Sequence, residues 1–304
     1  MKVLRHIMVI AVLTGFCPGA IAETVSRNVP LTTEITRIYL NGSNELHLSQ
    51  GEEEFVKLTA PEELLPRIEA RVKGKGLYLG REEGPWNDRS WTGFDLVTPV
   101  RFDVQLKTID AIRVWGSGNA TISELESDHL RIIIFGSGNV VSHGIRANKV
   151  NVEIGGSGEF EGDYIESSKV DLEINGSAKV ELARSVTRSV NIEINGAADM
   201  KLSDLTSEEL DVEINGTADL DLKGNVSSQE LEVNGSGGYT APDLLCDNAY
   251  IEIRGQGDVE VNVQRQLRAE LNRGAELVYY GNPELDLDIS GYGKYRNAGN
   301  NRRN

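Results

Sequence analysis

The sequence is poor in the side chains that bind soft metals or build a disulfide framework. Its 304 residues include two cysteines, four histidines and three methionines. This composition excludes a small disulfide-stapled domain and a zinc site built from cysteine clusters. Basic residues are also scarce, since 31 lysines and arginines stand against 47 aspartates and glutamates, a net charge of −16. Because nucleic acid is bound through basic side chains, we expect no nucleic-acid partner.

Sequence motifs of common enzymes are missing as well. No Gly-x-Ser-x-Gly elbow, Walker loop, Cys-x-x-Cys or His-x-x-x-His occurs. His47, His129 and His143 share no metal-ligand spacing. The sequence therefore favours a protein without a cofactor and without a catalytic site, apart from the weak Ca²⁺ or Mg²⁺ binding considered below.

The one long apolar run lies at the N-terminus and has the three parts of a secretory leader. Lys2 and Arg5 precede an apolar stretch over residues 7–16, and the small residues of Ala20–Ala22 follow it. The stretch is shorter than the roughly 20 residues that span a bilayer. We therefore expect residues 1–22 to be a cleaved signal peptide. The mature protein would be periplasmic, extracellular or on the cell surface, and not an integral membrane protein. Cys246 would be its single cysteine, and its position after two leucines predicts a buried, inert thiol.

Glycine is abundant and regularly placed. One series recurs with a nearly constant spacing and comprises Gly116, Gly136, Gly156, Gly176, Gly196, Gly216, Gly235, Gly255 and Gly274. In the best-kept copies the chain before the glycine alternates apolar and polar residues, as in Val170-Asp-Leu-Glu-Ile-Asn-Gly. That two-residue period indicates half-buried strands. A repeat of about 20 residues cannot bury its apolar face alone, so it must stack on its neighbours.

Stacked units predict an all-β fold, a parallel β-helix (β-solenoid) with about 20 residues per coil. Two interior columns are expected, Val152/Leu172/Ile192/Val212/Leu231/Ile251 and Ile154/Ile174/Ile194/Ile214/Val233/Ile253. The Asn-Gly pairs that begin at Asn175, Asn195, Asn215 and Asn234 are expected at corners, where both residue types tolerate positive φ.

The periodicity divides the chain into four parts. Residues 1–22 are the leader, and residues 23–100 form irregular N-terminal coils that cap the solenoid. Residues 101–295 form the regular β-helix, and residues 296–304 form a flexible polar tail. Within the first irregular part we expect the strand-turn-strand segments 38–48 and 69–79 to be successive coils.

The residues also carry a family resemblance. The segment LTAPEELLPRIEARVKGKGLYLG at 58–80 and the Gly-Ser-Gly turns at 116–118, 136–138 and 156–158 resemble the head GIN domain, a family of bacterial secreted auto-transporter adhesin domains. The likeness covers roughly residues 30–295. It implies a right-handed β-helix exported to the cell envelope, and it transfers no catalytic or binding residue because the function of the family is unsettled.

One repeat position is acidic in six consecutive coils. It is occupied by Glu153, Glu173, Glu193, Glu213, Glu232 and Glu252. The predicted fold stacks these carboxylates about 4.8 Å apart. They form either a solvated strip or a ladder that collects divalent cations, because hard oxygen ligands suit Ca²⁺ or Mg²⁺.

The segment 81–94 breaks the repeat and holds two of the three tryptophans. Trp86, Arg89 and Trp91 are candidates to bind a glycan or a partner protein, since loops on rigid scaffolds carry function. The alternative is a lid whose aromatic rings plug the first coils. Trp115, in the strand before Gly116, is expected to serve packing alone.

Two functions stay open at this point. The favoured one is a non-enzymatic binding, adhesive or scaffolding module of the cell envelope, whose partner is a glycan or an envelope protein. The alternative is a polysaccharide lyase or hydrolase, which cuts with clustered carboxylates, or with arginine and a cation, in a groove walled by long loops between coils. Residues 116–274 have almost no insertions that would wall such a groove. Exposed coil edges make a homo-oligomer compatible with either function.

Overall fold

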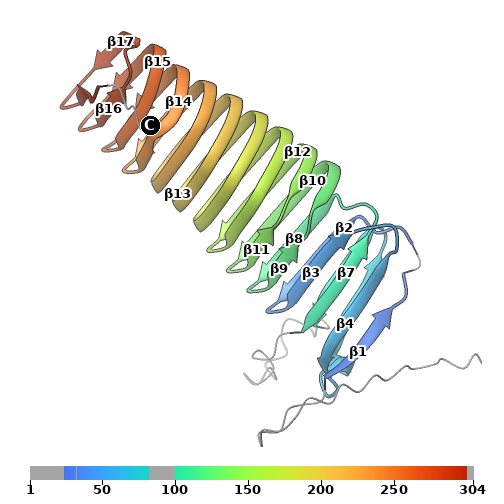
Figure 1. The fold of residues 1–304 in the computed structure, drawn as a ribbon. Helices are drawn as coiled ribbons and strands as arrows, with labels where there is room; N and C mark the ends of the chain where they lie inside the picture. Colours follow the sequence, from blue (N-terminus) through green and yellow to red (C-terminus); the bar gives the residue numbers. More distant parts are fainter. Residues whose placement is uncertain (1–23, 32, 82–99, 300–304) are drawn as a thin grey trace, which may run out of the picture.

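A computed structural model describes residues 24–31, 33–81 and 100–299 (Figure 1). The predicted signal peptide lies outside the described residues. Eighteen strands and one 3₁₀ turn, η1 (Leu65–Arg67), make up the described elements. The strands are β1 Thr24–Val29, β2 Arg37–Gly42, β3 Glu45–Gln50, β4 Phe55–Pro61, β5 Ile68–Lys73, β6 Gly76–Arg81, β7 Arg101–Leu106, β8 Ala111–Gly116, β9 Asn119–Ile122, β10 Leu125–Gly136, β11 Asn139–Ser142, β12 Ile145–Gly156, β13 Glu159–Gly235, β14 Gly238–Ile253, β15 Asp258–Leu271, β16 Glu276–Tyr280, β17 Glu284–Ile289 and β18 Lys294–Asn297.

The fold is a parallel β-solenoid with the predicted period. Residues 145–156 of β12 pair in parallel with residues 165–176 of β13, one repeat further along the chain. The short β11 pairs in the same way with residues 159–162 of β13. β13 runs through several coils as one continuous strand, and Figure 1 shows the coils stacked in an elongated body. The all-β β-solenoid prediction is therefore confirmed.

The interior includes the two predicted apolar columns, together with further buried side chains such as Phe160, Val180 and Met200. Val152 lies opposite Leu172 and Ile154 lies opposite Ile174. Every side chain of both columns is at most 3% exposed. Burying a side chain of this size contributes about 1.5–3 kcal/mol to stability. The buried polar residues of the described part are all uncharged, so alternating polarity alone places the charges on the outer surface.

The corners differ from the prediction in one respect. Gly176, Gly196 and Gly216 have φ values of 146° to 152°, within the region that favours glycine. Arg273 is the one non-glycine residue with positive φ among the residues the structure describes. The asparagines that precede the corner glycines therefore do not adopt positive φ, and a different role for them is described below.

The N-terminal coils are not stacked in chain order. β2 and β3 pair with β8 and β9 on one side and with β6 and β7 on the other. The segment that contains β6 and β7 thus lies outside the coil that precedes it in the chain. Residues 38–48 form a coil as predicted, but β5 forms an antiparallel hairpin with β6, so the prediction that residues 69–79 form a coil was wrong.

Antiparallel strands cover this end of the solenoid. β4 pairs antiparallel with β7, and β1 pairs antiparallel with β4 (Figure 1). A strand edge left open invites pairing with another chain, and antiparallel strands of this kind blunt it. At the opposite end, β18 pairs with β16 and runs to Asn297, inside the segment predicted to be a tail.

Cys246 is buried, as predicted. Its Sγ donates a hydrogen bond to the carbonyl oxygen of Asn248 at 2.9 Å. Burial raises the pKa of the Cys246 thiol to about 12. The thiol therefore stays protonated at neutral pH, which makes it unreactive.

Candidate binding face of the solenoid

One outer face of the solenoid carries columns of stacked side chains, and we call it the ladder wall. It consists of the outward-facing residues of the strand segments that end at the corner glycines, such as 111–116, 131–136, 151–156 and 171–176. The wall extends through β14 and β15 to β17. Because strands stack in register, each column repeats one position of the sequence from coil to coil.

The predicted acidic column is present and is longer than predicted. Glu153 lies opposite Glu173, and Glu232 lies opposite Glu252. The register continues from Glu252 to Glu270 and from Glu270 to Asp288. The sequence analysis missed these last two carboxylates because the repeat is shorter there than in the regular coils. Glu270 and Asp288 can be found in the sequence if the acidic position is followed through repeats of shorter length.

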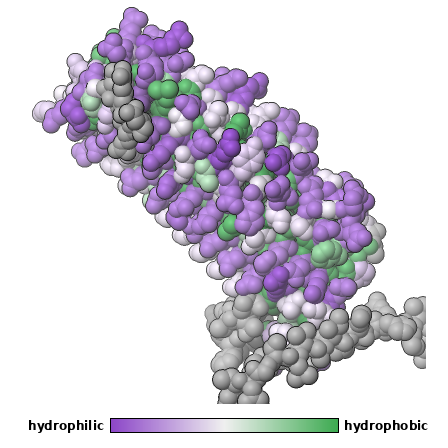
Figure 2. Space-filling view, viewed as in Figure 1, coloured by the Kyte–Doolittle hydropathy of each residue, from purple (hydrophilic) through white to green (hydrophobic). Residues whose placement is uncertain are grey.

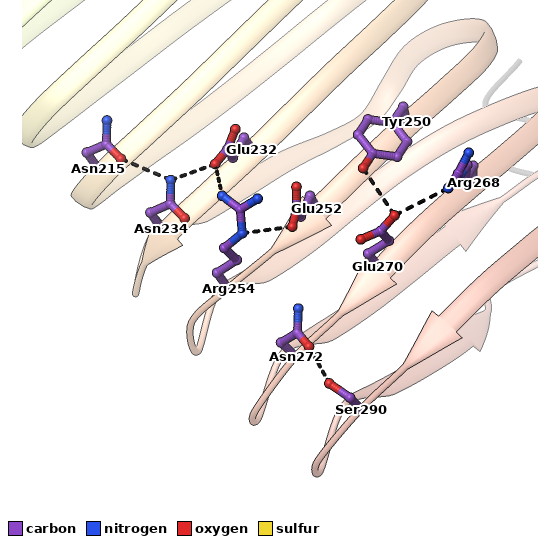
Figure 3. A network of polar contacts seen from close by, with 10 residues as sticks. All are labelled: Asn215, Glu232, Asn234, Tyr250, Glu252, Arg254, Arg268, Glu270, Asn272 and Ser290. Atoms are coloured by element: carbon purple, nitrogen blue, oxygen red, sulfur yellow. Dashed lines mark hydrogen bonds and ion pairs between the residues drawn. The ribbon is translucent and has the colours of Figure 1, made fainter.

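Neighbouring amides and guanidinium groups bind most of these carboxylates. The asparagine at the next outward position of the same strand donates its Nδ2 to Glu173, Glu193, Glu213 and Glu232 over 2.7 to 2.9 Å. Arg131 Nη2 lies 2.6 Å from Glu153 Oε2. Arg254 bridges Glu232 and Glu252 (Figure 3).

No group of three metal-ligating side chains arranged to hold an ion occurs among the described residues. The weak Ca²⁺ or Mg²⁺ binding expected of the column stays a prediction, which calorimetric titration with Ca²⁺ tests directly.

The asparagines next to the acidic column form a second, hydrogen-bonded column. Asn195 Nδ2 donates to Asn175 Oδ1 at 3.1 Å. Asn215 donates in the same way to Asn195, and Asn234 to Asn215, each at 3.1 Å. Each of these donating amides thus links two coils and also binds the glutamate of its own coil. This ladder is the role of the asparagines that sequence analysis had assigned to the corners.

Replacing one amide of this ladder by a carboxylate tests its contribution. We expect Asn195→Asp to lower the free energy of unfolding by about 1–2 kcal/mol at pH 7, because it removes two donated hydrogen bonds and adds a charge beside Glu193. Repulsion raises the folded-state pKa of the new carboxyl group above its unfolded value. The loss is therefore present at neutral pH and disappears as the pH falls and the carboxyl groups are protonated. Urea titrations at pH 7 and pH 4 measure it.

The matched control is Asn225→Asp, at an exposed position of β13 outside the ladder. It adds the same charge without breaking the amide column. Equal losses in the two variants at pH 7 would show that the ladder adds nothing to stability.

At its N-terminal end the ladder wall is aromatic. The acidic column continues through Ile133 and Arg113 to Tyr39 and Tyr78. The asparagine column continues through Gly155 to Phe135 and Trp115. We call the four rings, Tyr39, Tyr78, Trp115 and Phe135, the aromatic platform.

The rings of the platform are partly stacked and partly open to solvent. The Tyr39 and Tyr78 rings are stacked, with centroids 4.3 Å apart and planes 3° apart. The centroid of Trp115 lies 6.2 Å from that of Tyr39. Trp115 is 41% exposed and Phe135 is 42% exposed. Trp115 therefore points outward and packs beside Tyr39, and the expectation that it serves packing alone stays a prediction.

The irregular Gly-Gly sequence at 155–156 makes room for one of these rings. A Cβ atom at position 155 would lie 2.5 Å from Cε1 of Phe135. An asparagine at this position, as in the following coils, would collide with the ring. The asparagine column therefore begins one coil later, at Asn175.

Two guanidinium groups lie over the tyrosines. Cζ of Arg113 lies 5.2 Å from the centroid of Tyr39, and Cζ of Arg71 lies 5.7 Å from that of Tyr78. Both distances are within the range of cation–π attraction. Partial burial and the neighbouring Tyr39 raise the pKa of the Tyr78 phenol, so the phenol is neutral at neutral pH. The charge of this end of the wall thus comes from arginine.

The sequence-predicted loop site, Trp86, Arg89 and Trp91, lies outside the described residues. The platform was not predicted, because its aromatic residues lie within regular strands that are far apart in the sequence. The feature that could have revealed it is the alternation of side chains along a strand. It places Tyr39, Trp115 and Phe135 at positions that face outward.

One open depression lies at the C-terminal turns. Its lining residues are Arg254, Gln256, Asn272, Arg273, Gly274, Ser290, Gly291 and Tyr292. Glycoside hydrolysis needs two carboxyl groups on either side of the scissile bond. The depression has none in its lining, so it does not supply that chemistry.

Fold and site together define a β-solenoid with a solvent-exposed wall of side-chain columns. A family model described as "Putative auto-transporter adhesin, head GIN domain" matches residues 34–203 and 170–283. These matches cover well over half of the chain, which therefore belongs to this family, as its resemblance predicted. No curated protein matches the chain.

Solved structures share the fold at low sequence identity. A "putative adhesin" from Parabacteroides distasonis is 16% identical, with 91% of this chain and 98% of that chain covered and a TM-score of 0.56. A "putative adhesin" from Parabacteroides merdae is 17% identical, with 91% of this chain and 97% of that chain covered and a TM-score of 0.53. A "putative lipid binding protein" from Parabacteroides distasonis is 18% identical, with 91% of this chain and 98% of that chain covered and a TM-score of 0.51. These likenesses show the fold alone.

The described residues contain no helix of the length and apolar character needed to cross a membrane.

Proposed function

We propose that this protein is exported and acts as a non-enzymatic binding module of the cell envelope, with an adhesive role. The observation that carries the proposal is the aromatic platform, whose Trp115 and Phe135 rings form an exposed apolar cluster on an otherwise polar wall. Exposed apolar clusters rimmed by polar residues are typical of interaction sites. Figure 2 shows one face of the molecule, over which hydrophilic residues predominate and apolar ones gather in small patches.

Two further observations support a binding role. Backbone pairing in register and the amide ladder make the wall rigid, so side chains are ordered before a partner arrives. Preorganisation of this kind lowers the entropic cost of binding. The name of the family and the names of two structural neighbours are those of adhesins.

Export and binding are tested separately. Fractionation of the producing cells, with mass spectrometry of the mature N-terminus, should find the chain outside the cytoplasm and beginning after Ala22. Purified mature protein should sediment with isolated cell envelopes in a saturable way. A cytoplasmic chain that still begins at Met1, or a mature chain that does not sediment with envelopes, would contradict the proposal.

A further inference from the structure

We propose that the aromatic platform and Arg113 form a binding site for a carboxylated sugar, such as a uronic acid at the end of a glycan. The inference rests on the proposed binding function and names the site and the ligand class. Neither Trp86 nor Trp91 is part of it.

The platform provides the apolar half of the site. A pyranose ring presents a patch of electropositive C–H groups, and the face of an aromatic ring is electron-rich. Trp115 and Phe135 lie opposite each other in adjacent coils and are each about two-fifths exposed. Tyr39, which is only 9% exposed, stacks on Tyr78 and packs beside Trp115, so it supports the exposed rings from the side of the capped end. One sugar ring can therefore stack on aromatic surface without entering a pocket.

Arg113 provides the charged half. It lies between Tyr39 and Ile133 in its column, at the outward position before Trp115 on the same strand. Unlike Arg71, which pairs with Glu69 at 2.9 Å, and Arg131, which pairs with Glu153, it makes no ion pair with any described carboxylate. Its buried Nε has no hydrogen-bond partner among the described residues.

An unpaired guanidinium group next to exposed rings favours an anionic ligand. The planar guanidinium group can donate two parallel hydrogen bonds to the two oxygens of a carboxylate. The position over Tyr39 holds the guanidinium plane before binding. A sugar that stacks on Trp115 with its carboxylate toward Arg113 uses both halves of the site.

The charge of the rest of the wall limits the size of the ligand. Beyond Glu153, carboxylates occupy the acidic column in every coil to Asp288. A polyanionic chain laid along the whole wall would meet these charges, whereas one or two terminal sugars at the platform would not. Salt should weaken binding, because the decisive pair is electrostatic and partly exposed.

The test is calorimetric titration of the mature full-length chain with a galacturonic acid disaccharide. The matched probe is the same disaccharide with its carboxyl groups reduced to alcohols. We expect the wild type to bind the carboxylated probe at least tenfold more tightly than the reduced one. Trp115→Ala should weaken the binding of both probes at least tenfold. Arg113→Gln should weaken the binding of the carboxylated probe at least tenfold more than that of the reduced probe, so that the preference is lost.

The controls are Phe55→Ala, which removes an equally exposed ring on β4, and Arg184→Gln, which removes a guanidinium paired with Asp204 away from the platform. Circular dichroism should show all variants folded. Equal affinity for the two probes, no binding of either, or equal losses in variants and controls would overturn the inference. So would a Trp115→Ala variant that changes only the sedimentation coefficient, which would indicate that the platform binds a second copy.

The two levels of the proposal fail differently. If wild type, Trp115→Ala and Arg113→Gln sediment equally with envelopes, the site is wrong and the binding function stands. If the wild type does not sediment with envelopes, the proposed function itself fails.

Discussion

Gly196→Ala is expected to lower the free energy of unfolding by more than about 3 kcal/mol. Gly196 has a φ of 146°, which a residue with a Cβ rarely adopts. A Cβ atom there would lie 2.2 Å from the carbonyl oxygen of Gly176 in the preceding coil. A Cβ atom added at position 176 would likewise lie 2.2 Å from the carbonyl oxygen of Gly156, so the close stacking of the corner glycines leaves no room for a side chain at either position.

The measurement is thermal and urea-induced unfolding followed by circular dichroism, and the melting temperature should fall on the order of 10 °C. The matched control is Gly274→Ala, at a corner glycine whose added Cβ would meet only Cγ of Gln256, at 3.9 Å. It should change the stability by less than about 1 kcal/mol. Similar losses in the two variants would contradict the argument from close stacking.

Ile194→Ala is expected to lower the free energy of unfolding by about 3–4 kcal/mol. Ile194 is fully buried in the middle of an interior column whose neighbours, such as Ile174 and Ile214, are at most 1% exposed. The backbone ladders on either side fix the distance between coils, so the cavity left by the removed atoms cannot close. The loss should therefore lie well above the transfer free energy of the missing methyl and methylene groups.

A graded series separates cavity formation from general sensitivity. Ile194→Val should cost about 0.5–1.5 kcal/mol, and Thr217→Ala, at an exposed corner position, should cost less than about 0.5 kcal/mol. Chemical unfolding gives all three values. An Ile194→Ala variant as stable as Thr217→Ala would mean that the interior column is not closely packed.

Local pattern was sufficient for the regular coils. The spacing of the corner glycines fixes the length of a coil, and alternation fixes which side chains of residues 150–154 and their equivalents face inward. Both depend on neighbours within the same strand, so no long-range information is needed. The same alternation also places Trp115 on the outer face of its strand.

The sequence by itself determined the period, the interior columns and the acidic column, because each follows from a short repeated pattern. Only the tertiary structure decided that β2 and β3 lie between β6/β7 and β8/β9, since strands of similar pattern are interchangeable partners until the whole stack is formed. It also decided that Tyr39, Tyr78 and Trp115, far apart in the chain, meet on one wall. The physical reason is that hydrophobic alternation selects a face of a strand, whereas the choice of neighbouring strand depends on the packing of the complete solenoid.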